Sequence, residues 1–103
     1  RGVGRNPVTE EDFSRMEIFH SEDKIINPQR NAPTNWVVEY KLPFNFLSKY
    51  TEVDEPKTGV KWRANFYKCA DATTKPHWLT WSVLNKAKPD FHVPEFFGTL
   101  EFI

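Results

Sequence analysis

Three histidines and two carboxylates are the residues best suited to acid–base or metal chemistry. They are His20, His77 and His92, with Asp90 and Glu95 close to the last of them. A histidine beside a carboxylate can move protons, and such groups can hold a metal ion when enough of them converge. Asp90 and His92 lie only two positions apart and supply two ligands at most. The spacing therefore favours solvation or hydrogen bonding over a metal site.

The sequence lacks the motifs that usually accompany catalysis. It contains no HExxH zinc motif, no GxSxG nucleophile motif and no phosphate-binding glycine loop, and it has only four glycines. Its single cysteine, Cys69, cannot form an intrachain disulfide or a CxxC motif. We therefore expect a protein that is not an enzyme and that uses no cofactor, with a structural calcium ion left open.

A second set of residues combines aromatic rings with amide, guanidinium and imidazole groups. Sugar recognition needs both, because sugar C–H bonds stack on an aromatic face while the hydroxyls need donors and acceptors. Trp78 alternates with polar residues, and Phe91 lies in a proline-bounded, charged segment, so we expect both rings at the surface. A polar strand face can also be merely solvated. The predicted carbohydrate-binding residues are Phe91, His92, Asn65, Tyr67, Trp78 and Arg63.

Segments of alternating polarity must position these side chains. The alternation in residues 36–42 and 60–69 predicts two strands with one face each in the core. Residues 77–83 and 98–103 predict two further strands. Residues 12–20 favour a strand, although a short helix also fits their pattern.

The connecting segments and the tryptophans complete the expected architecture. A short helical turn at 45–50 and a long loop at 85–96 interrupt the strands. Three tryptophans alternate in phase with aliphatic residues and are assigned to packing, namely Trp36, Trp62 and Trp81. No 3.6-residue pattern is long enough for an α or α/β fold. The sequence therefore predicts an all-β fold, most simply a β-sandwich.

Length and charge exclude several classes of protein. A chain of 103 residues suffices for a single domain, which we expect over 1–103, with 1–11 as a linker or loop. Fourteen basic and fourteen acidic residues cancel, which leaves no obvious source of attraction to nucleic acid. No apolar run reaches the ~18 residues of a membrane span. We therefore expect neither nucleic acid nor a membrane as a partner.

Three motifs carry a resemblance to a known family. WRANFYKC at 62–69, HWLTWS at 77–82 and PDFHVPEFFG at 89–98 occur in this order, preceded by WVVEYKLPF at 36–44. In order and spacing these motifs resemble the bacterial carbohydrate-binding family 9-like proteins. The resemblance covers about residues 34–103 and corresponds to the C-terminal half of the family's domain.

The resemblance implies a two-sheet β-sandwich of immunoglobulin-like or jelly-roll-like type. Family members are nearly twice as long, and their N-terminal half adds strands and part of the binding site. We therefore expect this chain to form an incomplete sandwich, with a missing N-terminal half or a neighbouring domain as its partner.

The resemblance also implies non-catalytic binding of a mono- or oligosaccharide in support of polysaccharide utilisation, in the periplasm or outside the cell. In sugar-binding members two aromatic rings clamp the terminal sugar unit. One of these rings corresponds by position to Phe91, where those members typically have the larger Trp. The second ring is expected in the missing half. The polar groups of the site are expected from this chain, from Asn65, Tyr67 or Lys68.

Two other functions stay open at this point. Related sandwich domains bind haem for electron transfer through Met, His or Lys ligands, which here would require Met16 with His20 or His77. A Soret band in the absorption spectrum would distinguish that function from sugar binding. The other alternative is a structural or interaction module that supports a neighbouring domain.

Overall fold

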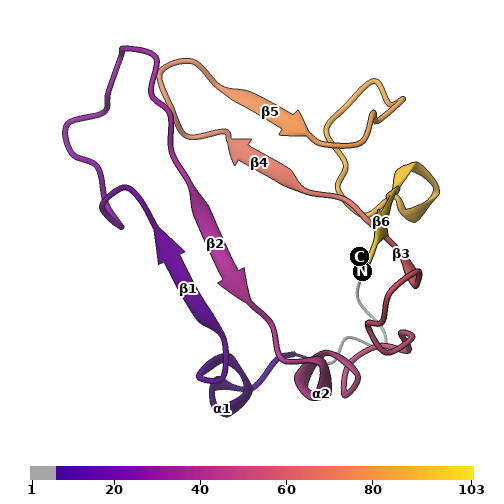
Figure 1. Cartoon of the computed structure of the whole chain (residues 1–103). Coiled ribbons are helices and arrows are strands. Elements are labelled where there is room, and N and C mark those ends of the chain that lie inside the picture. Colours follow the sequence, from indigo (N-terminus) through magenta and orange to yellow (C-terminus); the bar gives the residue numbers. More distant parts are fainter. Residues whose placement is uncertain (1–6) are drawn as a thin grey trace. The chain divides into compact units, whose positions relative to one another are not determined.

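The computed structural model describes residues 7–103, which form six short strands and three short helices (Figure 1). The strands pair antiparallel as β1–β2, β3–β6 and β4–β5. This confirms the predicted all-β class, and the antiparallel pairs are consistent with a β-sandwich. In chain order the elements are α1 (Glu10–Phe13), β1 (Glu17–His20), β2 (Val38–Lys41), α2 (Phe44–Leu47), β3 (Lys61–Ala64), β4 (Tyr67–Ala70), β5 (His77–Thr80), the 3-10 helix η1 (Pro94–Phe96) and β6 (Gly98–Glu101).

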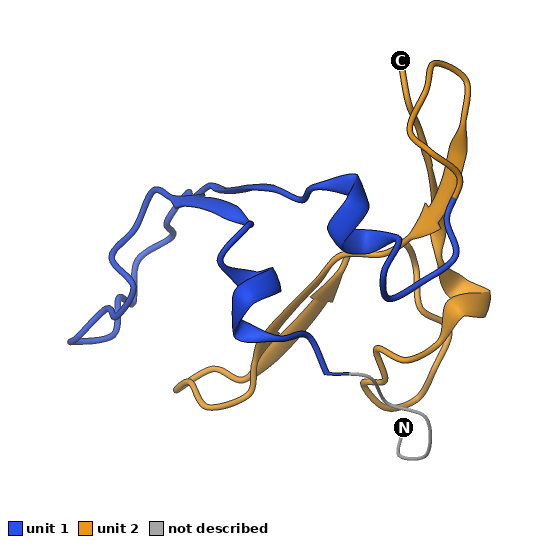
Figure 2. Ribbon diagram, turned by 90° about the horizontal axis from the view of Figure 1, so that it is seen from below, with its two compact units in different colours: residues 1–53 blue, residues 54–103 orange. Residues whose placement is uncertain are grey.

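The chain divides into two compact units, residues 1–53 and 54–103 (Figure 2). The first unit contains α1, β1, β2 and α2, and the second contains all remaining elements. A single domain over 1–103 stays a prediction. Of the segment 1–11 expected as a linker or loop, residues 1–6 lie outside the described residues, and α1 begins at Glu10.

In the first unit, the ambiguous segment 12–20 contains the end of a helix and a strand. The side chain of Thr9 caps α1 by accepting a hydrogen bond from the backbone N–H of Asp12 at 3.2 Å. Acidic residues fill the first turn, where the helix dipole favours negative charge. The strand β1 begins only at Glu17, so the predicted strand exists in the second half of the segment.

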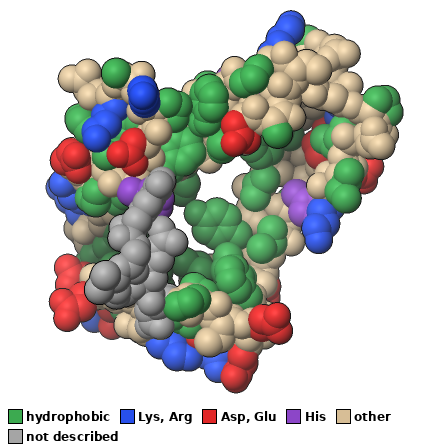
Figure 3. Space-filling view, turned by 180° about the vertical axis from the view of Figure 1, so that it is seen from behind, with side chains coloured by type: hydrophobic (Ala, Val, Ile, Leu, Met, Phe, Trp, Pro, Cys, Tyr) green, Lys and Arg blue, Asp and Glu red, His purple; other side chains and the backbone are tan. Residues whose placement is uncertain are grey.

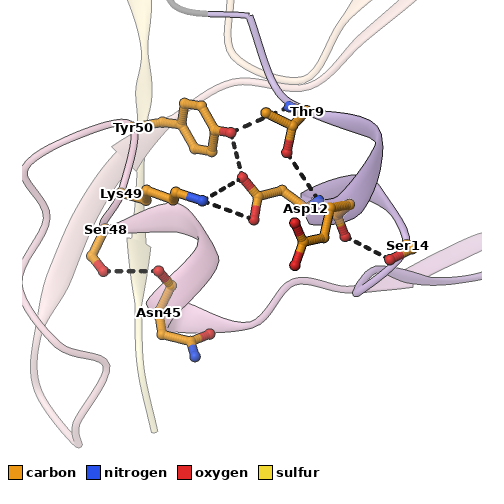
Figure 4. Close-up of polar contacts among 8 residues, drawn as sticks. Thr9, Asp12, Ser14, Asn45, Ser48, Lys49 and Tyr50 are labelled. Atoms are coloured by element: carbon orange, nitrogen blue, oxygen red, sulfur yellow. Dashed lines mark hydrogen bonds and ion pairs between the residues drawn. The ribbon is translucent and has the colours of Figure 1, made fainter.

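A buried carboxylate joins α1 to the residues that follow α2 (Figure 4). Asp12 is only 1% exposed. Its carboxylate accepts hydrogen bonds from Lys49 Nζ at 2.9 and 3.2 Å and from the Tyr50 hydroxyl at 2.5 Å. These hydrogen bonds, that from Tyr50 first and that from Lys49 next, lower the pKa of Asp12 to about 2. The same contact raises the pKa of Lys49.

We expect Asp12 to make the stability of the chain depend on pH in the acid range. Its pKa is about 2 in the folded chain and about 3.9 in an unfolded one, so its contribution is complete above about pH 4. That contribution is lost as the pH falls through about 2. Urea unfolding between about pH 5 and about pH 2 should show this loss in the parent chain and a smaller one in Asp12→Asn. Equal slopes for the two proteins would contradict the assignment.

The face of β2 expected in the core is exposed in the first unit. The register pairs Ile18 with Tyr40 and His20 with Val38, which gives β1–β2 one largely apolar face. Tyr40 is nevertheless 53% exposed and Trp36 is 48% exposed, so the prediction that Trp36 is buried in a core was wrong. The alternation gives the face its polarity, but a two-stranded sheet has no second layer of its own to cover it. In the space-filling view of Figure 3, hydrophobic side chains are visible at the surface of the protein.

In the second unit, the single strand expected at 60–69 is two strands in different sheets. β3 pairs with β6, and β4 pairs with β5. The break occurs at Asn65, whose side-chain oxygen accepts hydrogen bonds from the backbone N–H groups of Phe66 at 2.9 Å and Ser82 at 2.8 Å. A side chain that bonds the backbone in this way competes with a regular sheet ladder.

Two tryptophans of the second unit pack against other rings, but the expected core position of Trp81 was wrong, because Trp81 is 53% exposed. Trp62 meets Phe102 edge to face with ring centroids 4.8 Å apart. Trp81 meets Phe66 edge to face at 5.6 Å. Its ring also covers Gly98, where an added Cβ would lie 2.6 Å from a ring carbon. Glycine at this position therefore makes room for the ring.

Candidate functional site

The site is built on one face of the β4–β5 pair. In an antiparallel pair, residues directly opposite each other share a face. Tyr67 lies opposite Thr80, and Cys69 lies opposite Trp78. Tyr67 and Trp78 therefore project from the same face. Trp78 is 43% exposed, in agreement with the predicted surface position.

Phe91 reaches this face from the loop that follows β5. Its ring stacks on the ring of Tyr67, with centroids 4.2 Å apart and an interplanar angle of 21°. Phe91 and Trp78 both line a cavity of about 290 Å³. The cavity lies within the second unit and is lined by residues 78–80 and by loop residues between Leu84 and Phe91. Three of the six predicted residues thus come together here, two of them at the cavity itself.

Asp90 fixes the loop that carries Phe91. Its Oδ1 accepts a hydrogen bond from the backbone N–H of His92 at 3.0 Å, and its Oδ2 lies 3.5 Å from Lys86 Nζ. Aspartate commonly stabilises turns by bonding to the backbone two residues onward. The spacing of Asp90 and His92 favoured hydrogen bonding or solvation over metal binding, and the structure shows a hydrogen bond between them, but its role in positioning Phe91 was not predicted. The side chain of His92 is exposed and does not line the cavity.

Asn65 and Arg63 use their polar groups within the protein. The amide of Asn65 donates to Thr80 Oγ1 at 3.0 Å and to the Ser82 carbonyl at 3.2 Å. Arg63 donates to the carbonyl of Phe97 at 2.9 Å. Neither residue lines the cavity. Their direct contact with a sugar stays a prediction.

The hydroxyl of Tyr67 is buried and has no hydrogen-bond partner among residues 7–103. Buried polar groups nearly always have a partner, and one without a partner requires an explanation. This hydroxyl belongs to the ring on which Phe91 stacks. It is a polar group of the site whose hydrogen-bonding capacity is unused in the described chain.

Lys68, also considered for sugar contact, lies on the other face of β4–β5. It pairs with Leu79 in the register, and its Nζ contacts His77 Nε2. Nδ1 of His77 lies 2.9 Å from the carbonyl oxygen of Lys75. Since a lysine ammonium can only donate, this arrangement requires the tautomer with its hydrogen on Nδ1 of His77.

The residues considered for metal or haem binding are the three histidines with Met16, Asp90 and Glu95. Within residues 7–103, no three His, Cys, Asp or Glu side chains lie close enough to hold a metal ion. Met16 is half-buried between α1 and β1, and Nδ1 of His20 lies 2.5 Å from the carbonyl oxygen of Glu22.

None of the helices in the described part of the chain is long and apolar enough to cross a membrane.

Comparisons with known proteins connect this geometry to a family. The family described as carbohydrate-binding family 9 matches residues 1–102. A solved structure of a candidate carbohydrate-binding protein from Bacteroides uniformis is similar, with 25% sequence identity and a TM-score of 0.66. The similarity covers 99% of this chain and 46% of that one, so this chain spans less than half of that protein's length. No curated protein matches significantly.

Proposed function

The chain belongs to carbohydrate-binding family 9, and from this membership we propose that it binds a carbohydrate without altering it chemically. The observation that carries the proposal is the cavity of the second unit, which both Trp78 and Phe91 line. Aromatic walls with a few polar groups at the edge are typical of small-ligand sites. The exposed ring of Trp78 offers a stacking surface for the C–H bonds of a sugar.

Tyr67 supports the smaller of the two rings in this proposal. Its ring covers one face of Phe91, and Phe91 itself lines the cavity. Such support offsets the smaller area of Phe91 relative to a tryptophan, because a ring held in place loses less entropy on binding. Trp78 then supplies the second ring from the same unit, where the family resemblance alone suggests a ring from the missing half.

The size of the cavity bears on how much of a glycan enters it. Its volume of about 290 Å³ lies at the lower end of the range of small-ligand pockets. A cavity of this size suits one terminal sugar unit better than a long stretch of polysaccharide. We further propose that the chain acts in the periplasm or outside the cell, where it would encounter such a ligand. There it would support polysaccharide utilisation.

Isothermal titration calorimetry of the full chain with a panel of mono- and oligosaccharides tests this function. The proposal expects at least one sugar to bind, with no conversion of that sugar during a long incubation followed by chromatography. Release of a new product would show catalysis and contradict the non-catalytic part of the proposal. If no sugar of the panel binds and a partner domain does, a structural or interaction module becomes the better account.

We expect the Tyr67 hydroxyl to add nothing to stability, and its removal tests whether it reaches a ligand from behind Phe91. A buried hydroxyl without a partner costs free energy in the folded chain, so Tyr67→Phe should unfold at an equal or higher urea concentration. If the hydroxyl bonds a sugar oxygen, the same change should weaken sugar affinity by roughly fivefold, the effect of one hydrogen bond. Urea unfolding and calorimetry measure the two effects separately. Unchanged affinity would exclude the hydroxyl from the binding site.

A further inference from the structure

Two lysines give the cavity a positive lining. Lys86 and Lys88 both line it, and no aspartate or glutamate does so. The chain as a whole has a formal net charge of +0, so this concentration of one sign is local. We propose that the ligand of this site is an acidic carbohydrate, in which a carboxylate or sulfate group on the sugar meets these lysines. This inference rests on the proposed function and specifies its substrate class.

The two lysines differ in how much of their charge is already neutralised. Lys86 Nζ lies 3.5 Å from Asp90 Oδ2, so part of its charge is offset. Lys88 has no hydrogen bond or ion pair with any other residue of the described chain. Asp90 is the acidic residue that follows Lys88 in the loop. Its two oxygens already contact Lys86 and the His92 amide. Lys88 is therefore the cation most available to a ligand.

The surroundings of the lysines favour an anionic sugar over a simple inorganic anion. Residues from Trp78 to Phe91 supply apolar and aromatic walls beside the two lysines. A lysine ammonium is a compact point charge that accepts either a carboxylate or a sulfate. The rings recognise the sugar and the lysines recognise its charge, so both parts of an acidic sugar have a counterpart.

Calorimetry with matched ligands tests the inference on the full chain. The probes are an oligogalacturonide, its carboxyl-reduced neutral counterpart, and a sulfated form of that neutral oligosaccharide. We expect the acidic forms to bind more tightly than the neutral one, and their affinity to fall as NaCl rises from about 50 to about 300 mM. The preference between the carboxylate and sulfate forms identifies the source of the charge.

Lys88→Gln should weaken binding of the acidic oligosaccharide about three- to fivefold, the effect of losing one partly exposed ion pair. Its affinity for the neutral oligosaccharide should stay the same. Lys61→Gln is the matched control, because Lys61 is an exposed lysine on β3 that does not line the cavity. This control should bind all three probes as the parent chain does.

The outcomes separate the inference from the function on which it rests. Equal binding of neutral and acidic forms without salt dependence overturns the acidic-ligand inference and leaves carbohydrate binding standing. A loss of acidic binding in Lys61→Gln as large as in Lys88→Gln also overturns it, because the attraction would then be general. Binding of none of the three probes counts against the inference, whereas only failure of the whole sugar panel counts against the function.

Discussion

Trp78→Ala is expected to weaken carbohydrate binding about tenfold to a hundredfold. Trp78 lines the cavity with an exposed ring, and truncation of a central aromatic side chain commonly costs about 2 kcal/mol or more of binding free energy. Phe91→Ala should have a similar effect, because it removes a second wall and the stacking partner of Tyr67. Calorimetry with the best ligand of the sugar panel measures both variants.

Trp36→Ala is the matched control for this first prediction. Trp36 is 48% exposed and lies in the first unit, so it resembles Trp78 in type and exposure but does not line the cavity. Its removal should leave the affinity unchanged. Urea unfolding of each variant verifies that a loss of affinity is not a loss of folding. If Trp36→Ala loses binding and Trp78→Ala keeps it, the site has been assigned to the wrong unit.

Asn65→Ala is expected to destabilise the chain by about 2–3 kcal/mol. The side chain of Asn65 accepts two backbone N–H groups and donates to Thr80 and to the Ser82 carbonyl. Alanine would leave several of these groups without a partner, and each buried one costs about 1–3 kcal/mol. The midpoint of urea unfolding measures the change. Partial exposure of the network keeps the expected value below the sum of the individual costs.

Asn65→Asp is the matched variant for this second prediction. It keeps the oxygen that accepts from Phe66 and Ser82 but loses the amide donor. We therefore expect a smaller loss of stability than in Asn65→Ala. The pair also tests the sugar-contact role predicted for Asn65. A variant with unchanged stability and weakened sugar affinity would show that the side chain contacts the ligand instead of supporting the strands.

The sequence was informative about strands because their alternation is local. Every strand of the second unit lies within or next to a segment of expected strand, including β5 and β6. The break at Asn65 was not predicted, since the polar alternation continues through it. The break depends on hydrogen bonds with Ser82, a residue 17 positions away. Periodicity contains no information about such a partner.

Burial was predicted less well than secondary structure. Alternation in 36–42 shows which side chains share a face, but it does not show whether another layer covers that face. Trp36 is exposed for this reason, although its neighbours in sequence suggested a core position. Trp62 was assigned correctly, because its partner Phe102 belongs to the strand segment expected at the end of the chain.

Individual residues of the site were predicted from the sequence, but the cavity that brings them together was not. Trp78 and Phe91 were each expected at the surface from their polar surroundings. Their shared cavity depends on the loop after β5, whose turn Asp90 stabilises through the His92 amide. Lys88 gave no signal in the sequence, because a lysine in a polar loop is usually solvated. Its place in the cavity, which it shares with Lys86, is visible only in the structure.

The most direct test of the account is an NMR titration of the 15N-labelled chain with its best sugar ligand. The four tryptophans give separate indole N–H signals, which can be assigned with single-tryptophan variants. The account predicts that sugar shifts the Trp78 indole signal and the backbone amides of residues 86–91, while the Trp36 signal stays in place. Saturable binding that leaves the Trp78 and 86–91 signals unmoved would contradict it.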